Sequence, residues 1–491
     1  YLKQACEEND CKEGGNVIIM DPDTGDILAM ATYPDYNLND PYTLEFVPED
    51  EWKDMSGDEQ YALQQQTWNN RAISYAYEPG SVFKIVTAAA GLEEGLADAD
   101  TPNVYHCEGH ETIDGVTINC SDTSGHGDLS LRDALKYSCN PAFMQLGRKV
   151  GAATLYRYYD AFGLFDYTNF ADIGDSGSSG ESNSIFWDLD NVGSIELATM
   201  SFGQRFKITP LQMISAVAAV ANDGKLMQPR IAKEIKNTDT GAITTIEPVE
   251  VRQVISKETA DTLLDMLETV VDSGTGSYAQ VKGYTIAGKT GTSEADYSDS
   301  NSVKVASFAA ITPVESPELV ILLTLYGPQG DSTGGGTIAA PVVAQILSEV
   351  LPYLEIPSNS TDSEMETTAL TSVVNKTVGE AKKIIEKQGF ECIISGDSNE
   401  IVSSQMPVEG TQLIEGSVVR LYTEDNDTRV SQTVPNLKGM SLSEAKATLK
   451  NKNLNIKYSG TGKVTSQDVT SGSKVEEGTV ITVVLKEEID E

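Results

Sequence analysis

EPGSVFKIVTAAAGLEEGL, residues 78–96, is the segment from which the organisation of the whole chain can be worked out. Pro79 and Gly80 are turn residues, and the apolar residues that follow at helical spacing predict a helix that begins at Ser81. The first turn of a helix favours a developing negative charge, because its backbone N–H groups are free and the helix dipole is positive there. Lys84 lies one turn later on the same face and can reach the Ser81 hydroxyl. If this lysine is shielded from solvent, its pKa falls and it can act as a base for the serine.

A middle motif, Ser138-Cys139-Asn140, lies between two segments of helical pattern, with Pro141 expected to interrupt them. Ser138 offers a hydroxyl that can relay a proton, and Asn140 offers a polar group that can position the reactants. An isolated Ser-x-x-Lys pattern occurs by chance in long chains and usually marks a helix start with a solvated lysine. The catalytic interpretation therefore depends on this motif and on the next one.

The third motif is Lys289-Thr290-Gly291-Thr292, at the end of a predicted strand. Lys289 is expected to supply a cation for a substrate carboxylate, and the hydroxyls of Thr290 and Thr292 can bind the same group. Gly291 is expected to let a substrate approach the backbone closely. The backbone N–H groups of Ser81 and Thr292 could form an oxyanion hole. Together the three motifs predict acyl transfer through a serine ester.

Two other enzyme classes are weighed against this interpretation. Residues 283–290 fit the phosphate-loop pattern G-x-x-x-x-G-K-[ST], but the following GTSEADYSDSN lacks the helical periodicity that a phosphate-binding helix requires. The would-be loop is also β-prone rather than glycine-rich. The three histidines cluster in one region of the sequence, which argues against a Ser-His-Asp triad.

The composition narrows the choice of partners. The net charge is −39 and the isoelectric point is about 4.3, so the chain is not expected to bind nucleic acid or to adsorb directly to anionic lipid. The sequence contains no run of about eighteen apolar residues, so no membrane span is predicted. The sequence begins with Tyr1, and we interpret it as a processed or excised piece whose anchor has been left off.

The predicted fold class is α/β (α+β), with an antiparallel sheet covered by helices. Its strands are expected at residues 15–20 and 27–31, which form a hairpin, and in the segments around 284–291, 303–313 and 318–328. Residues 356–369 are polar and rich in Ser and Thr, which is typical of a linker. The rest repeats itself, because VVNKTVGEAK from Val373 matches VPNLKGMSLSEAK from Val434. The predicted domains are 1–14 (the tail of a missing N-terminal region), 15–355 (the main domain), 356–369 (the linker), and the repeats 370–427 and 428–491.

Cys107, Cys120, His126 and Cys139 form the pattern C-x12-C-x5-H-x12-C. The first two cysteines lie at the two ends of a short predicted hairpin, and His126 lies in a Gly-His-Gly turn. If the residues on either side of Cys139 face the catalytic serine, the Cys139 thiol must face the layer behind. Three thiolates and one imidazole are a normal set of ligands for structural zinc.

The alternative is a Cys107–Cys120 disulfide, which would leave His126 and Cys139 unexplained. His106 and His110 could replace His126 as a ligand.

The three ordered motifs resemble those of the transpeptidase domain of class B penicillin-binding proteins, and the repeats resemble PASTA domains. The segments GQRFKITPLQMISAVAAVANDG and GKTGTSE are also similar to that family. One departure is Arg205, where relatives usually have a small residue. Some members of the family carry a metal just behind the middle motif, and the last three spacings of the zinc pattern match theirs.

The resemblance implies the penicillin-binding/transpeptidase fold and a peptidoglycan D,D-transpeptidase that is acylated by β-lactams and needs no cofactor for catalysis. Ser81 would be the nucleophile, Lys84 the base, Ser138 the relay and Asn140 the positioning group. Lys289, Thr290 and Thr292 would bind the carboxylate or the β-lactam. The enzyme would act on the outer face of the cell membrane, held by an N-terminal helix, with division or sporulation machinery that includes a glycosyltransferase partner. A D,D-carboxypeptidase or β-lactamase, and a β-lactam-binding sensor or scaffold, remain alternatives.

Overall fold

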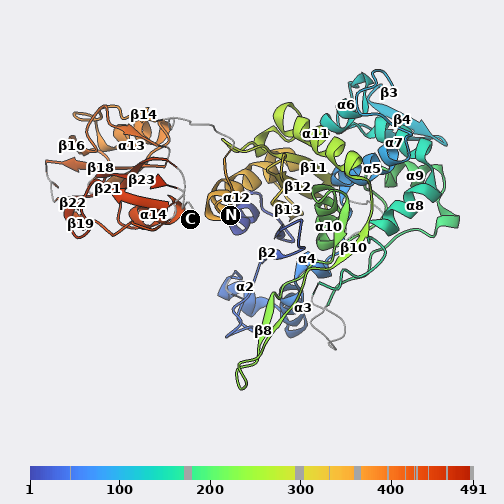
Figure 1. The fold of residues 1–491 in the computed structure, drawn as a ribbon, viewed down its shortest axis with the longest axis horizontal. Helices are drawn as coiled ribbons and strands as arrows, with labels where there is room; N and C mark the ends of the chain where they lie inside the picture. The colour runs from blue at the N-terminus through green and yellow to red at the C-terminus, as the bar shows by residue number, and fades with distance from the viewer. Residues whose placement is uncertain are drawn as a thin grey trace. The chain divides into compact units, whose positions relative to one another are not determined.

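A computed structural model shows the protein as two compact units, Tyr1–Ser348 and Glu349–Glu491, each with its own sheets and helices (Figure 1). The residues that the structure describes are 1–44, 46–170, 180–293, 303–330, 332–358, 367–394, 397–414, 416–424, 426, 429–440, 442–460 and 463–486.

The first unit is built on a five-stranded antiparallel sheet in the order β11-β12-β13-β1-β2. Its strands are β1 (Gly15–Met20), β2 (Ile27–Tyr33), β11 (Ala287–Ser293), β12 (Val305–Thr312) and β13 (Leu319–Tyr326). The predicted N-terminal hairpin and the three later strands are all present. They form one sheet because β1 pairs with β13 from Gly15↔Leu325 to Met20↔Val320. The third sequence motif lies on β11, at one edge of this sheet.

Helices cover both faces of the sheet. Figure 1 shows α10 (Pro210–Ala221) and α11 (Lys257–Ser273) on one side, and α1 (Leu2–Glu8) with α12 (Ala340–Tyr353) on the other. The side chains on the sheet face toward α10 and α11 belong to one large core that also includes residues of α5 (Lys84–Glu93) and α7 (Asn140–Val150). They are Ile18, Met20, Ala309, Ile311, Val320 and Leu322. The predicted architecture, an antiparallel sheet covered by helices, is therefore present.

One helix of the described part of the chain, Gly335–Tyr353, is long and apolar enough to cross a bilayer. Val343, Leu347 and Leu351 on this helix are fully buried, and they recur every four residues along one face. That spacing is the core-facing stripe of a helix in a globular domain, so packing against the domain accounts for the apolar composition.

The second unit contains the two sequence repeats, and each forms a helix and a three-stranded sheet with the same topology. In both repeats the third strand lies in the middle, parallel to the first strand and antiparallel to the second. The first repeat has α13 (Val378–Lys387), β15 (Glu391–Ile394), β16 (Val402–Met406) and β18 (Val418–Thr423). The second has α14 (Leu442–Lys450), β20 (Asn455–Ser459), β21 (Lys463–Gln467) and β23 (Val480–Lys486).

Buried polar groups join the two repeats. The side chain of Asn455 makes two hydrogen bonds with the backbone of Val418, accepting from its N–H at 2.7 Å and donating to its carbonyl at 2.8 Å. The guanidinium of Arg420 lies 3.1 Å from the carboxylate of Glu477, and the two side chains are only 10% and 6% exposed. A buried ion pair between two small domains fixes their relative position, because breaking it would leave a charge without compensation.

We therefore expect Glu477→Ala to destabilise the second unit by about 3–5 kcal/mol, the cost of removing one partner of a buried ion pair. Urea unfolding of the full chain, followed by circular dichroism, will measure the effect. Glu476→Ala is the matched control, because the adjacent Arg429–Glu476 pair is 43% and 35% exposed and should contribute at most about 1 kcal/mol. Equal effects of the two substitutions would show that the repeats are not held together by Arg420 and Glu477.

Candidate active site

Ser81 lies in a tight turn packed against β11. The turn is the 3-10 helix η1 (Gly80–Phe83), and the α-helix α5 (Lys84–Glu93) begins only after it. The predicted helix is present and holds Ser81 in its first turn, but that turn is 3-10 rather than α, as is common at helix starts. Gly80 has φ +56°, and a Cβ there would lie 2.6 Å from the Thr292 carbonyl oxygen. Only glycine allows the serine turn to approach β11 this closely.

Lys84 is fully buried one turn after Ser81. Its Nζ donates to the Ser138 carbonyl oxygen at 2.6 Å, the Ser138 Oγ at 3.2 Å and the Asn140 Oδ1 at 2.8 Å. Burial lowers the pKa of Lys84 to about 7, although the nearby thiols of Cys139, Cys120 and Cys107 oppose this shift when they are ionised. A neutral amine, the form that acts as a base, is thus accessible near neutral pH.

Ser138 lies in a left-handed backbone conformation, φ +55°, between α6 (Leu131–Lys136) and α7 (Asn140–Val150). A positive φ in a non-glycine residue is strained and is often retained at functional sites. Pro141 was predicted to interrupt a helix. It lies instead in the first turn of α7. A proline fits there because the N–H it lacks would have no partner within the helix.

Lys289 meets the middle motif from the opposite side. Its Nζ donates to the Ser138 Oγ at 2.9 Å, and to the carbonyl and hydroxyl oxygens of Thr290, each at 3.1 Å. The side chain is fully buried, so burial lowers the pKa of Lys289, and the positive charge of Lys84 lowers it further. Lys289 therefore does not line the cleft itself, and its Nζ is linked to the cleft by hydrogen bonds to the hydroxyls of Ser138 and Thr290, which do.

A cleft of about 710 Å³ brings these groups together at the surface. It is lined by most of the predicted residues: Ser81, Ser138, Asn140, Thr290 and Thr292. Gly291 is required by packing within the fold, because a Cβ there would lie 2.2 Å from the Ser307 Oγ and 2.9 Å from a methyl group of Val82. Glycine at this position lets β11 pack against β12 and the serine turn, so close approach of a substrate is not needed to explain it.

Arg205, the departure noted in the sequence, does not line the cleft, although its neighbour Gln204 does. Its guanidinium pairs with Glu196 at 3.3 Å, and its backbone N–H donates to the Glu78 carboxylate at 2.9 Å. Arg205 thus supports the start of the serine motif.

Thr275 is a site residue that the sequence analysis missed. Its hydroxyl lies 3.1 Å from that of Thr290, and its backbone N–H donates to the Lys136 carbonyl oxygen at 3.2 Å. It therefore joins the end of α6 to the third motif. Three consecutive glycines, Gly334–Gly336, also line the cleft. A Cβ on Gly335 would meet the Gly291 carbonyl oxygen at 2.3 Å, and the triple glycine in the sequence was the available signal for this close approach.

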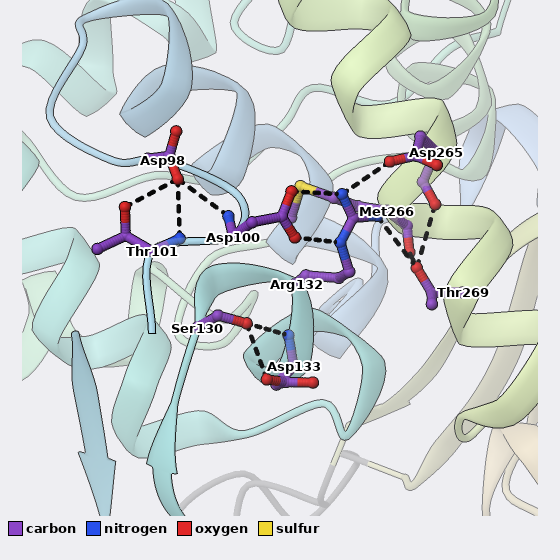
Figure 2. Close-up of polar contacts among 9 residues, drawn as sticks. All are labelled: Asp98, Asp100, Thr101, Ser130, Arg132, Asp133, Asp265, Met266 and Thr269. Atoms are coloured by element: carbon purple, nitrogen blue, oxygen red, sulfur yellow. Dashed lines mark hydrogen bonds and ion pairs between the residues drawn. The ribbon is translucent and has the colours of Figure 1, made fainter. Parts of the chain in front are cut away.

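Arg132 joins α6 to two other segments, as Figure 2 shows. Its Nε and Nη2 donate to the two carboxylate oxygens of Asp100 at 2.6 and 2.9 Å, and its Nη2 lies 2.7 Å from the Asp265 carboxylate. Its Nη1 donates to the Thr269 hydroxyl at 3.4 Å. Asp265 and Thr269 belong to α11, so Arg132 attaches this end of α6 to α11, and Thr275 attaches the other end to the loop that follows α11. These two attachments fix the helix that leads directly into Ser138.

We expect Thr275→Val, which keeps the shape but removes the hydroxyl, to slow acylation by benzylpenicillin by about tenfold, a typical effect of losing a residue that orients a functional group. Thr275→Ser should restore most of the rate, because it keeps the hydrogen bond to Thr290. Stopped-flow acylation rates of the three proteins provide the measurement. A Thr275→Val protein as fast as the wild type would contradict the positioning role.

Three cysteines and one histidine form a compact cluster behind the middle motif. Cys107, Cys120 and Cys139 are buried, His126 is half-buried, and their ligand atoms all lie within 4.8 Å of one another. The Nδ1 of His126 lies 3.6 Å from the Cys107 sulfur and 3.5 Å from the Cys120 sulfur. A tetrahedral site with Zn–S bonds of about 2.3 Å and Zn–N bonds of about 2.0–2.1 Å places N and S about 3.6 Å apart. The donor set and its spacing therefore fit zinc.

The local strands explain why the cluster forms. The predicted hairpin consists of β4 (His110–Ile113) and β5 (Val116–Asn119), and the Cys120 N–H donates to the Gly109 carbonyl oxygen at 2.8 Å, which keeps the ends of the hairpin together. Cys107 lies just before it on β3 (Tyr105–Cys107), which pairs with β6 (Gly127–Leu129) immediately after His126. His106 instead lies 2.6 Å from Asp128 at the surface, and His110 is exposed, so His126 is the histidine of the cluster.

Most of the chain matches known protein families. The model of the penicillin binding protein transpeptidase domain matches residues 15–348, and that of the PASTA domain matches residues 369–425 and 432–487. Stage V sporulation protein D of Bacillus subtilis is 33% identical over 84% of this chain and 62% of its own length. Peptidoglycan D,D-transpeptidase PbpA of Mycolicibacterium smegmatis is 33% identical over 67% of this chain and 65% of its own length. The chain thus spans less than two thirds of either relative.

The fold is also that of a solved structure. The D,D-transpeptidase domain of a peptidoglycan glycosyltransferase from Eggerthella lenta superposes with a TM-score of 0.57 at 29% identity, covering 70% of this chain and 80% of that domain. The fold predicted from the three motifs is thereby confirmed.

Proposed function

The chain belongs to the family of penicillin-binding protein transpeptidases and carries two PASTA domains, and on this basis we propose that it is a peptidoglycan D,D-transpeptidase that cross-links stem peptides through an acyl-enzyme on Ser81. The observation that carries the proposal is the position of Ser138. Its hydroxyl accepts hydrogen bonds from two buried lysines, Lys84 and Lys289, and it lines the same cleft as Ser81.

In this mechanism the Ser81 Oγ attacks the carbonyl carbon of the terminal D-Ala–D-Ala peptide bond while Lys84 removes its proton. The oxyanion that forms is held by the backbone N–H groups of Ser81 and Thr292. The proton passes through the Ser138 hydroxyl to the leaving D-alanine amine, and Asn140 positions Lys84 for this transfer. An acceptor amine then attacks the ester and releases Ser81. The hydroxyls of Thr290 and Thr292 bind the substrate carboxylate, or that of a β-lactam, and no step requires a cofactor.

Two alternative activities share this chemistry up to the acyl-enzyme. A D,D-carboxypeptidase would pass the acyl group to water, and a β-lactam sensor or scaffold would not turn over a peptide at all. Incubation with a donor stem peptide and an amine acceptor, followed by mass analysis of the products, separates the three. The proposal expects a cross-linked product. Hydrolysis alone, or no product despite acylation by benzylpenicillin, would contradict it.

The pH dependence of acylation follows from the lowered pKa of Lys84. A base acts only when deprotonated, so the rate should increase with pH through about 7 and then level off. Because Lys84 and Lys289 share Ser138, the inflection belongs to the pair rather than to one residue. Acylation by benzylpenicillin measured between pH 5.5 and 8.5 tests this. A flat profile over this range would show that no group of the pair titrates there.

We also propose that Cys107, Cys120, His126 and Cys139 hold a structural zinc ion. The proposal is supported by the spacing of the donor atoms, which all lie within 4.8 Å of one another, with the His126 Nδ1 3.6 and 3.5 Å from the sulfurs of Cys107 and Cys120. Bound zinc would fix Cys139, and with it the backbone between Ser138 and Asn140. Its influence on catalysis would be through position alone.

The cellular role is proposed from the relatives. Similarity to Stage V sporulation protein D favours a sporulation enzyme, and similarity to a D,D-transpeptidase named FtsI from Escherichia coli keeps cell division as the alternative. Either role places the enzyme on the outer face of the cell membrane, anchored by an N-terminal helix and working with a glycosyltransferase that polymerises the glycan. Co-purification of the full-length protein from membranes with such a glycosyltransferase tests this proposal.

A further inference from the structure

The helix α1 ends in a Schellman motif, a turn in which the last carbonyl groups of a helix are satisfied by the next two backbone N–H groups. Asp10 has the left-handed conformation that the motif needs, with φ +45°. The Asp10 N–H donates to the Glu7 carbonyl oxygen at 3.3 Å, and the Cys11 N–H donates to the Cys6 carbonyl oxygen at 2.9 Å. These are the two hydrogen bonds that define the motif.

This motif brings two particular side chains together, those of the third residue from the helix end and of the second residue beyond the cap. In most proteins they form an apolar contact, but here both are cysteines, Cys6 and Cys11. The two thiols are hydrogen bonded to each other, which raises the pKa of Cys6 and lowers the pKa of Cys11. Cys6 is buried and Cys11 is half-buried. The pair is separate from the proposed zinc cluster, which uses three of the other four cysteines.

We propose that Cys6 and Cys11 are a site of oxidation and form an intramolecular disulfide that closes the end of α1. The inference rests on the proposed location outside the cytoplasm, where disulfides persist. The Cys11 thiolate, the more accessible of the two, attacks a sulfur of a disulfide oxidant, either a dithiol–disulfide exchange protein or a small-molecule disulfide, and releases one thiol. Cys6 then attacks the mixed disulfide at Cys11 and releases the second thiol. The two cysteines lose two electrons and two protons, and the oxidant is reduced to two thiols.

The disulfide would act as a structural brace. The residues around the turn are hydrogen bonded to the segment that follows β13: the Gln329 N–H donates to the Asn9 carbonyl oxygen at 3.0 Å, and the Lys12 N–H donates to that of Gly327 at 3.1 Å. Cys6 itself packs inward, because a Cβ on Gly15 at the start of β1 would lie 3.0 Å from its sulfur. Closing the turn therefore holds α1 against the sheet, at a distance from the catalytic groups.

The test counts thiols in the full chain after exposure to glutathione disulfide. The protein is then denatured with a chelator and alkylated, so that cysteines released from zinc also react. We expect four of the six cysteines to be alkylated in the wild type, and a non-reduced peptide that links Cys6 to Cys11. Cys6→Ser should retain the mixed disulfide and give four alkylated cysteines with one glutathione adduct at Cys11, Cys11→Ser should give five alkylated cysteines, and the double variant four with no adduct.

Reduction should lower the Tm of the wild type by a few degrees and leave that of the double variant unchanged. Six alkylated cysteines in the oxidised wild type would overturn the inference. So would a loss of two thiols that persists in the double variant, which would place the disulfide elsewhere. Acylation of Ser81 by benzylpenicillin is measured in parallel, because neither cysteine belongs to the active site. Normal acylation without a disulfide contradicts this inference alone, whereas a disulfide without acylation contradicts the proposed function alone.

Discussion

Ser81→Ala will abolish covalent labelling by benzylpenicillin, with a loss of more than about 10⁴-fold in the rate of acylation, because removal of a nucleophile eliminates the step that forms the ester. The wild type should gain the mass of one drug molecule per chain, and the variant should gain none. Intact-mass spectrometry with and without the drug gives both results. The fold should be unaffected, since the Ser81 side chain is only partly buried and faces the cleft.

Ser121→Ala is the matched control for this experiment. Ser121 is a second serine that lines the same cleft, so it meets the same drug concentration and a similar environment. It lacks a lysine one turn later, and we expect the Ser121→Ala protein to be labelled at the wild-type rate. If Ser81→Ala still takes up the drug while Ser121→Ala does not, the nucleophile has been assigned to the wrong residue. Labelling that survives both substitutions would exclude a serine ester at either position.

The parts of the site that lie close together in the sequence could be predicted well. Ser81 and Lys84 are three residues apart in the continuous helical segment of η1 and α5, which places Ser81 at the cleft and the Lys84 Nζ at Ser138. The hairpin around Asp114-Gly115 was also predictable, because its turn sequence favours the positive φ values, +48° and +81°, that the structure shows. In these cases the local backbone preference and the final fold agree.

The contacts between distant segments could not be predicted in the same way. That Lys289 is buried under Ser138 depends on how β11 lies beside α6 and α7, and no local pattern specifies this. Likewise, Gly291 is required by Val82 and Ser307, which are far from it in the sequence. Thr275 was missed for the same reason, since its hydroxyl acts on Thr290 from a loop with no recognisable pattern. Only the order of the three motifs along the chain indicated that these distant segments form one site.

The cysteine cluster is an intermediate case. The spacing of its four residues suggested that they bind one metal ion, and the structure brings their donor atoms within 4.8 Å of one another. The spacing alone, however, did not decide between His126 and the other two histidines. That choice follows from β3 and β6, which place His126 beside the thiols, and from Asp128, which lies beside His106 at the surface.

Cys139→Ser should lose the metal, melt at a lower temperature and acylate about 10–100-fold more slowly, even though Ser81 and Lys84 are unchanged. The physical reason is that a tetrahedral structural site needs all its ligands, and metal binding contributes directly to folding free energy. Without the metal, Cys139 no longer holds the backbone between Ser138 and Asn140, so the hydrogen bonds of Lys84 to both residues weaken. Elemental analysis of wild-type protein purified without added metal should find one zinc per chain.

The matched control is Cys392→Ser, because Cys392 lies on β15 in the second unit, outside the cluster. This variant should keep its zinc, its melting temperature and its acylation rate. Wild-type protein that contains no metal and yields a peptide with a Cys107–Cys120 disulfide would refute the zinc site and establish the alternative. A Cys139→Ser protein that keeps one zinc but acylates slowly would instead show that the thiol acts on the middle motif by packing. Cys139 is buried at the start of α7, so loss of its packing alone would slow acylation without releasing the metal, and the metal content therefore decides between the two explanations.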